Sequence, residues 1–286
     1  MPVEAFGHTD CGKVRIANED DYLYHRFDLP PETGTPHLHL AAVADGIGGH
    51  LGGQVASALA VKVLIESLSL ALAEPDKARD YRHLFKACIE RVNQEIFRQA
   101  SLDARLTGMG STMVAALLKG HKALVANVGD CRAYLHRDGA LTQITQDHNW
   151  KEEQLRARKI PEAEILYSPL RNMVTRSLGF EAAVDVDLFE LEMVEDDYLL
   201  LCSDGLYKPL VNRKIAKAFK GRKTPEEICR GLVRKAVRKG GQDNITAVVL
   251  QLRAGREGKA ENVSLSDTVK LRVPIGSSRK GNGLHD

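Results

Sequence analysis

Five aspartates stand at the borders of apolar segments, where side chains from different strands can meet. Asp45 and Asp204 directly follow apolar runs, in HLHLAAVADG and DYLLLCSDG. Asp20 and Asp243 precede the runs of NEDDYLYH and GGQDNITAVVLQL, and Asp130 stands in the turn of ALVANVGDCRAYL. In an antiparallel sheet the end of one strand lies beside the start of its neighbour. The first four side chains are therefore predicted to converge at one rim of the fold, and Asp130 joins them if its hairpin points the same way.

Carboxylates gathered in this way would repel one another, and their pKa values would rise unless a positive charge were present. A divalent cation resolves this conflict. The available ligands are all oxygens, from aspartates and from strand-end carbonyls such as that of Gly46. Such a set favours Mg²⁺ or Mn²⁺ over zinc or copper, so the pattern predicts a site for hard divalent cations.

The glycines after Asp45 have competing interpretations. An isolated Asp-Gly pair after a strand is ordinarily a turn, and Asp138-Gly139 is interpreted as one. Asp45-Gly46 differs because further glycines follow at positions 48, 49, 52 and 53, before a predicted helix. A glycine-dense turn lets the backbone approach a ligand closely. The glycines at 46, 48 and 52 miss the dinucleotide-binding spacing by one residue, which disfavours a nucleotide cofactor.

The elements that must position these residues can be predicted from hydrophobic periodicity and turn chemistry. Strands are predicted at 37–44, 112–118, 122–128, 132–136, 141–145, 197–202 and 244–252, and helices at 54–72, 77–100, 149–159, 214–219 and 225–239. Short turn sequences join two pairs of these strands, which must then be antiparallel. Helices come in blocks instead of alternating with strands, so the prediction is an α+β fold of antiparallel sheets covered by helices.

Composition favours one large domain and a polar tail. The chain has 286 residues, 43% of them hydrophobic, which suffices for one sizeable core. We expect a single domain at 1–252 and a mobile tail at 253–286, where Gly, Ser and charged residues dominate. The net charge of +2 gives no general reason to expect nucleic acid or a membrane surface as partner.

Three features favour a cytoplasmic location. The five cysteines are widely spaced with no Cys-x-x-Cys pair, and are expected to be reduced thiols. The first residues lack the basic and then apolar pattern of a secretory signal. The most apolar stretch, 58–73, is interrupted by Lys62 and Glu66, so no membrane span is expected.

Seven motifs together resemble those of one family, bacterial serine/threonine phosphatases of the protein phosphatase 2C type, the metal-dependent PPM class. The resemblance covers roughly residues 7 to 252, with the motifs in the family's order. They are RIANED at 15–20, VADGIGGHLGGQVAS at 43–57, GST at 110–112, VGDCRAYL at 128–135, TRSLG at 175–179, CSDGLY at 202–207 and GGQDNIT at 240–246.

The resemblance implies a central β-sandwich of two antiparallel sheets, flanked on both sides by helices, with two Mn²⁺ or Mg²⁺ ions at one end. Asp45 would bridge both ions, and the carbonyl of Gly46 would bind one of them. Asp204 and Asp243 would complete the protein ligands of the other. Asp130, together with Asp204, is similar to the pair that holds a third, weaker metal in bacterial members.

The resemblance also implies the chemistry. A hydroxide bridging the metals would attack phosphorus in line and hydrolyse phosphoserine or phosphothreonine in proteins. Arg15 would bind the phosphoryl group, and Glu19 and Asp20 would act through metal-bound waters. The implied partners are phosphorylated proteins, including a bacterial eukaryotic-like Ser/Thr kinase and its targets, and the expected state is a monomer.

The chain departs from the family's pattern at two positions. Ile47 stands where animal members have a histidine proposed as general acid, so the proton donor is open between His50, His148 and a metal-bound water. Lys208 replaces an acidic residue of some relatives, which weakens the expected third site. The alternative hypothesis is a catalytically silent binding or signalling module that keeps the fold.

Two further segments concern partners. Residues 147–174, which include Trp150, correspond to the family's flap, and we expect this flap to help select the protein substrate. Arg230, Arg234 and Arg238 recur every four residues on the last predicted helix, and Lys235 and Lys239 adjoin them. A solvated helix face is the favoured interpretation, and docking of an acidic partner is the alternative.

Overall fold

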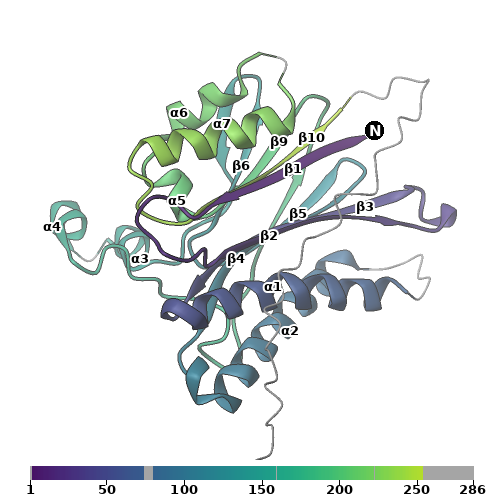
Figure 1. The fold of residues 1–286 in the computed structure, drawn as a ribbon. Coiled ribbons are helices and arrows are strands. Elements are labelled where there is room, and N and C mark those ends of the chain that lie inside the picture. Colours follow the sequence, from purple (N-terminus) through teal and green to yellow (C-terminus); the bar gives the residue numbers. More distant parts are fainter. Residues whose placement is uncertain (1, 74–79, 159, 222, 254–286) are drawn as a thin grey trace, which may run out of the picture.

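Two antiparallel five-stranded sheets lie face to face in the computed structural model, which describes residues 2–73, 80–158, 160–221 and 223–253 (Figure 1). One sheet has the order β1 (Val3–Asp10), β10 (Ile245–Leu252), β9 (Tyr198–Cys202), β6 (Arg132–Arg137) and β7 (Ala140–Gln143). The other has the order β2 (Asp20–Asp28), β3 (His37–Ile47), β4 (Gly110–Lys119), β5 (Lys122–Val128) and β8 (Asp187–Glu192).

Helices cover both outer faces of this sandwich (Figure 1). On the β2–β8 sheet lie α1 (Gly49–Leu72) and α2 (Tyr81–Leu102); on the other lie α6 (Asn212–Ala216) and α7 (Pro225–Arg238). The short helices α3 (Trp150–Ala157) and α4 (Glu162–Tyr167) project from one end, and α5 (Asp204–Tyr207) follows β9. Single 3₁₀ turns occur at Pro31–Thr33, Ala104–Leu106 and Lys217–Phe219. The predicted architecture, an α+β sandwich flanked by helices, is confirmed.

Three apolar clusters hold the four layers together. One lies between α1, α2 and the β2–β8 sheet, a second lies between α6, α7 and the other sheet, and the third fills the space between the sheets. Strand β4 is buried at nine of its ten positions because both of its faces are covered. This explains its continuous run of small and apolar residues where a half-exposed strand would alternate.

Local signals set the helix ends. Helix α7 begins with a capping box, in which Thr224 and Glu227 satisfy each other's backbone N–H groups, and Pro225 occupies the first turn. Helix α2 begins at Asp80, whose carboxylate accepts from the N–H groups of Arg82 and His83. The start of the predicted helix at 77 lies outside the described residues, as does the tail predicted for 253–286 apart from residue 253.

Three differences from the sequence prediction affect the site. Strands β1, β2 and β8 were not among the predicted strand ranges, although the run after Asp20 was treated as apolar. Strand β3 continues to Ile47, so Asp45 lies within the strand instead of after it. The segment after β9 turns directly into α5, which places Asp204 at the first position of a helix.

Helix α1 contains one stretch, Leu51–Leu72, that is long and apolar enough to cross a membrane by length and composition alone. Lys62 and Glu66 interrupt this stretch, and their exposed side chains pair with each other at 3.9 Å. In the fold, α1 packs against β3, β4 and α2, the position of a core helix.

Candidate active site

The two N-terminal aspartates of the site face each other across neighbouring strands. Asp20 is the first residue of β2 and is paired with Asp45 of β3 in the antiparallel register. Like charges directly opposite each other destabilise a sheet. The pairing is therefore unfavourable unless a positive charge compensates the two carboxylates.

The carboxylate of Asp20 also connects the two sheets. Its Oδ2 accepts hydrogen bonds from Ser203 Oγ and Thr246 Oγ1, both at 2.7 Å. Ser203 directly precedes Asp204, and Thr246 lies in β10, three residues after Asp243. Sequence reasoning missed both hydroxyls. Their small polar side chains within the CSDGLY and GGQDNIT motifs were the available signal.

The remaining aspartates come to the same end of the sandwich. Asp204 opens α5, Asp243 precedes β10, and Asp130 lies in the turn between β5 and β6. Burial raises the pKa of Asp45 well above its usual range, and the charges of Asp20, Asp204, Asp130 and Asp243 raise it further. The structure thus brings all five aspartates within electrostatic reach of one another.

The pKa values of two further aspartates are raised for the same reasons. Burial is the main cause for Asp20, whose hydrogen bonds to Thr246 and Ser203 act in the opposite direction. Burial also dominates for Asp130, and the charge of Asp204 adds to it while Lys208 opposes it. Carboxylates in this state are stabilised by a cation.

Gly46 and Glu19 form a crowded turn beside Asp45. A Cβ atom on Gly46 would lie 2.0 Å from the carbonyl oxygen of Gly53 and 2.8 Å from that of Glu19, so only glycine fits. The Gly46 N–H donates to the Glu19 carbonyl at 3.0 Å, and the Glu19 N–H donates to Asn244 Oδ1 at 2.8 Å. This turn connects Glu19 to both Asp45 and Asp243 through their sequence neighbours.

Two side-chain cations lie among the carboxylates. Arg15 pairs with Asp243 through two bonds, Nε to Oδ1 at 2.8 Å and Nη2 to Oδ2 at 2.9 Å. Lys208 Nζ pairs with Asp204 Oδ2. Within the described ranges, no three acidic, histidine or cysteine side chains already form a closed metal site. Two of the expected ligands are instead engaged by these cations.

The donor set nevertheless fits a hard divalent cation. In the part of the chain that the structure describes, Asp20 Oδ1 and Asp204 Oδ1 are buried and have no hydrogen-bond partner. Unpaired carboxylate oxygens are costly to bury, and a cation would satisfy them. Every available donor is oxygen, as Mg²⁺ and Mn²⁺ prefer.

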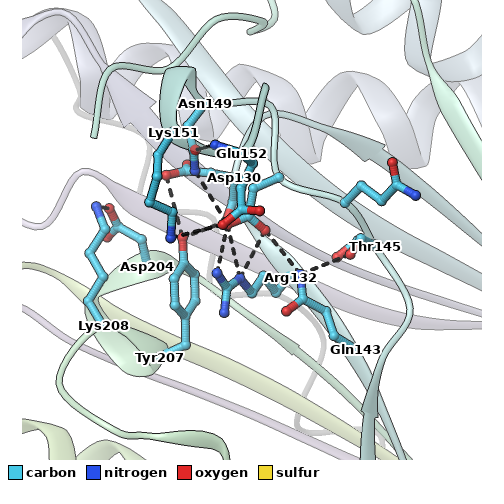
Figure 2. Close-up of polar contacts among 12 residues, drawn as sticks. Asp130, Arg132, Gln143, Thr145, Asn149, Lys151, Glu152, Asp204, Tyr207 and Lys208 are labelled. Carbon is cyan, nitrogen blue, oxygen red and sulfur yellow. Dashed lines mark hydrogen bonds and ion pairs between the residues drawn. The ribbon is translucent and has the colours of Figure 1, made fainter. Parts of the chain in front are cut away.

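A buried network supports Asp130 (Figure 2). The hydroxyl of Tyr207 donates to the Asp130 carbonyl at 2.9 Å, and the Arg132 guanidinium lies 3.6 Å from the centre of the Tyr207 ring. Arg132 is also bound by Asp147, with Nε to Oδ1 at 2.9 Å and Nη2 to Oδ2 at 2.7 Å. Sequence reasoning considered these motifs only for their aspartates, so it missed Arg132 and Tyr207.

The base of the predicted flap is fixed next to this network. An isolated bridge joins Asn149 to Val174, which closes the two ends of segment 147–174. His148 is only 2% exposed; its Nδ1 accepts from the Gly129 N–H and its Nε2 bonds Asp187, both at 3.0 Å. Because both ring nitrogens are engaged, this geometry favours a structural role for His148, and the identity of the proton donor stays a prediction. The side chain of His50 lies outside the described residues.

Comparison with known proteins identifies relatives over most of the chain. The family model described as protein phosphatase 2C matches residues 5–245. A serine/threonine phosphatase named stp from Listeria monocytogenes is 35% identical over 256 residues, which are 88% of this chain and 96% of the relative.

Solved structures agree with this match. The serine/threonine phosphatase PstP/Ppp of Mycobacterium tuberculosis superposes with a TM-score of 0.74 at 33% identity, over 88% of this chain and 99% of that one. A structure of the catalytic domain of the serine/threonine phosphatase PstP contains two manganese ions; it has a TM-score of 0.71 at 31% identity and covers 88% of this chain and 99% of that one.

Proposed function

This chain belongs to the protein phosphatase 2C family, and from that premise we propose that its aspartate cluster is the centre at which it hydrolyses phosphoserine and phosphothreonine in proteins. The chain is a metal-dependent serine/threonine phosphatase that uses Mn²⁺ or Mg²⁺. The observation that carries the assignment of the centre is the mutual electrostatic reach of five buried or half-buried aspartates.

We propose the following residues as the metal ligands. Asp45, in the middle of the cluster, and the carbonyl of Gly46 would bind on the β3 side, and Asp204 and Asp243 on the β9–β10 side. Asp130 would contribute with Asp204 to a further, weaker site. When bound, the cations would withdraw charge from the phosphoryl group and lower the pKa of the attacking water.

Arg15 would orient the phosphoryl group. Its bonds to Asp243 use Nε and Nη2, which leaves Nη1 for a phosphoryl oxygen. The planar guanidinium can bind Asp243 and the substrate at once, which a lysine could not do with the same geometry. Glu19 and Asp20 would act through metal-bound water. One carboxylate oxygen of Asp20 already accepts hydrogen bonds from Ser203 and Thr246.

The kinase partner, the cellular location and the oligomeric state are inferred from general chemistry. A phosphatase of phosphoserine and phosphothreonine requires a kinase that makes them, so we include a Ser/Thr kinase and its targets among the partners. All five cysteines are free, which supports a reducing compartment such as the cytoplasm. We further propose that residues 1–252 act as one catalytic domain and as a monomer.

Hydrolysis of a phosphothreonine peptide tests this function. Phosphate release should require Mn²⁺ or Mg²⁺ and should stop on chelation. Asp204→Asn should reduce kcat/KM by more than the roughly 10–100-fold typical of changes outside the ligand shell. Asp138→Asn, in the turn between β6 and β7, is the control and should keep wild-type activity. Metal-independent turnover would overturn the mechanism, and an inactive wild-type chain would favour the silent binding module.

A further inference from the structure

The three arginines of α7 have different surroundings. Arg230 is paired with Glu226 at 2.8 Å and lies over the ring of Phe6 at 5.0 Å. Arg234 and Arg238 are exposed and have no ion pair with any residue that the structure describes. Of the three arginines, Arg230 is therefore neutralised within the chain, whereas Arg234 and Arg238 are available to a partner.

Arg234 and Arg238 line a groove of about 320 Å³ between α7 and the strand β1. Lys13 lines the same groove and is also exposed. Burial and the nearby charge of Arg230 lower the pKa of His8, so this groove residue is neutral at pH 7. Asp10 is the acidic residue of the lining, and its carboxylate accepts from the Gly12 N–H at 2.8 Å. The groove thus has a net positive charge, although the whole chain is nearly neutral.

The groove adjoins the phosphate-binding residues. The Lys13 N–H donates to the Gly241 carbonyl at 2.7 Å, which joins the loop after β1 to the loop before β10. Lys13 precedes Arg15 by two residues, and Gly241 precedes Asp243 by two. Two residues span at most about 7 Å of backbone, so a polypeptide with its phosphoryl group at Arg15 can extend into the groove.

We propose that the groove lined by Lys13, Arg234 and Arg238 binds aspartate or glutamate side chains of the substrate polypeptide close to the phosphorylated residue. The proposal rests on the proposed function and names the substrate class. Charge complementarity carries it, because two guanidinium groups and one ammonium group line the groove and have no ion-pair partner among the described residues. Arginine also binds carboxylates through two parallel hydrogen bonds, which favours acidic side chains over a diffuse negative surface.

The test compares phosphothreonine peptides whose neighbouring residues differ. One peptide has Asp residues before the phosphothreonine, a second has them after it, and a third has Ser and Gly on both sides. The wild-type enzyme should prefer at least one acidic peptide. R234E/R238E should lower kcat/KM for that peptide by about tenfold through KM, and should leave the neutral peptide and p-nitrophenyl phosphate unchanged.

K235E/K239E is the matched control. Lys235 and Lys239 are exposed on the same helix but do not line the groove, so this variant makes the same change in net charge. It should retain the acidic preference, and thermal melts should confirm that both variants fold. The wild-type preference should also decrease with added salt.

Three results would overturn the proposal: no acidic preference in the wild type, an unchanged preference in R234E/R238E, or equal losses in both double variants. Equal losses would mean that the helix acts through its general charge instead of through the groove. Activity on the neutral peptide in any of these cases would leave the phosphatase function intact. Failure of the function itself would instead abolish hydrolysis of every peptide and of p-nitrophenyl phosphate.

Discussion

The two carboxylate oxygens of Asp204 have different surroundings. One carboxylate oxygen is paired with Lys208, and the other is buried without a hydrogen-bond partner among the described residues. Burial acts to lower the pKa of Lys208, but the charge and hydrogen bond of Asp204, with smaller contributions from Asp130 and Asp45, keep this pKa above its usual value. Lys208 therefore offsets part of the negative charge of the metal-free cluster and would compete with a cation for Asp204.

We expect Lys208→Met to raise the affinity for Mn²⁺. In the metal-free protein the same change should lower the free energy of unfolding by about 1 kcal/mol, because Asp204 loses its counter-charge. Isothermal titration with Mn²⁺ and thermal melts with chelator and with Mn²⁺ measure both effects. Lys62→Met removes a similar i,i+4 pair far from the cluster and should change neither metal affinity nor the stabilisation by metal. Unchanged or weaker Mn²⁺ binding by Lys208→Met would contradict the competition.

At the scale of elements, one side chain of α2 fastens the loop that returns toward the site. Asn93 is 1% exposed; its Oδ1 accepts from the Gly179 N–H at 2.8 Å, and its Nδ2 donates to the carbonyls of Glu181 and Ala182 at 3.0 and 3.3 Å. The loop has no regular structure of its own between Gly179 and Ala182, so these bonds replace the pairing that a strand would have.

Asn93→Leu should therefore destabilise the protein by about 2–3 kcal/mol. The similar volume of leucine keeps the packing, but three backbone groups of the loop lose their partner. Denaturant unfolding measures the loss. Gln94→Leu, on the exposed side of the same helix, is the control and should change stability by no more than about 0.5 kcal/mol. Equal stability of the two variants would show that the loop does not depend on Asn93.

The elements that sequence predicted well are those with strong local signals. The prediction for β5 matches its bounds of Lys122–Val128, and that for α7 exceeds its bounds by one residue. A short apolar run and a hairpin turn define the first, and a capping box and an amphipathic stripe define the second. For these elements the local preference and the tertiary structure agree.

The elements that were missed depend on distant partners. Strand β1, VEAFGHTD, has mixed polarity and an internal glycine, and it becomes a strand because β10 pairs with all eight of its residues. A Cβ on Gly7 would lie 2.3 Å from the ring of Tyr22, so this glycine makes room for the other sheet. Strand β8 pairs only with β5 at the edge of its sheet.

The aspartates of the site could be predicted from the sequence, but the ion pairs around them could not. Asp20, Asp45, Asp130, Asp204 and Asp243 were placed by their positions at strand borders, and the structure brings them together. The local rule that Asp-Gly ends a strand predicted the end of β3 too early, because β4 continues to pair with it as far as Ile47. The ion pairs of Arg15 and Lys208 could not be predicted, since they depend on side-chain orientation across 228 positions in one case and on a short helix in the other.

At the scale of the whole molecule, stability should depend on pH through a histidine outside the site. His39 in β3 is 5% exposed, and its Nδ1 bonds the Tyr24 hydroxyl at 2.9 Å. Burial, with smaller contributions from the charges of His37 and Arg26, lowers its pKa to about 4. Between about pH 6.5 and pH 4, His39 is therefore protonated in the unfolded chain and neutral in the folded chain.

This contribution to stability is complete above pH 6.5 and is lost as the pH falls toward 4, up to about 3 kcal/mol. His39→Gln should remove it, so the difference in unfolding free energy between wild type and variant should shift in favour of the variant as the pH falls. Denaturant unfolding at pH 7, 6, 5 and 4.5 measures this shift. His121→Gln, at an exposed position, should follow the wild-type curve. A constant difference between His39→Gln and wild type would contradict the assignment.

The pairing of β1 with β10 also determines when catalysis can begin during synthesis. The strand at Val3–Asp10 is completed only by residues 245–252, and Arg15 meets Asp243 only when both ends are present. A nascent chain still emerging from the ribosome thus lacks part of the proposed phosphate-binding site until residues 243–252 are translated. At roughly 5–20 residues per second, the unfinished enzyme remains inert toward phosphoproteins for most of its translation time.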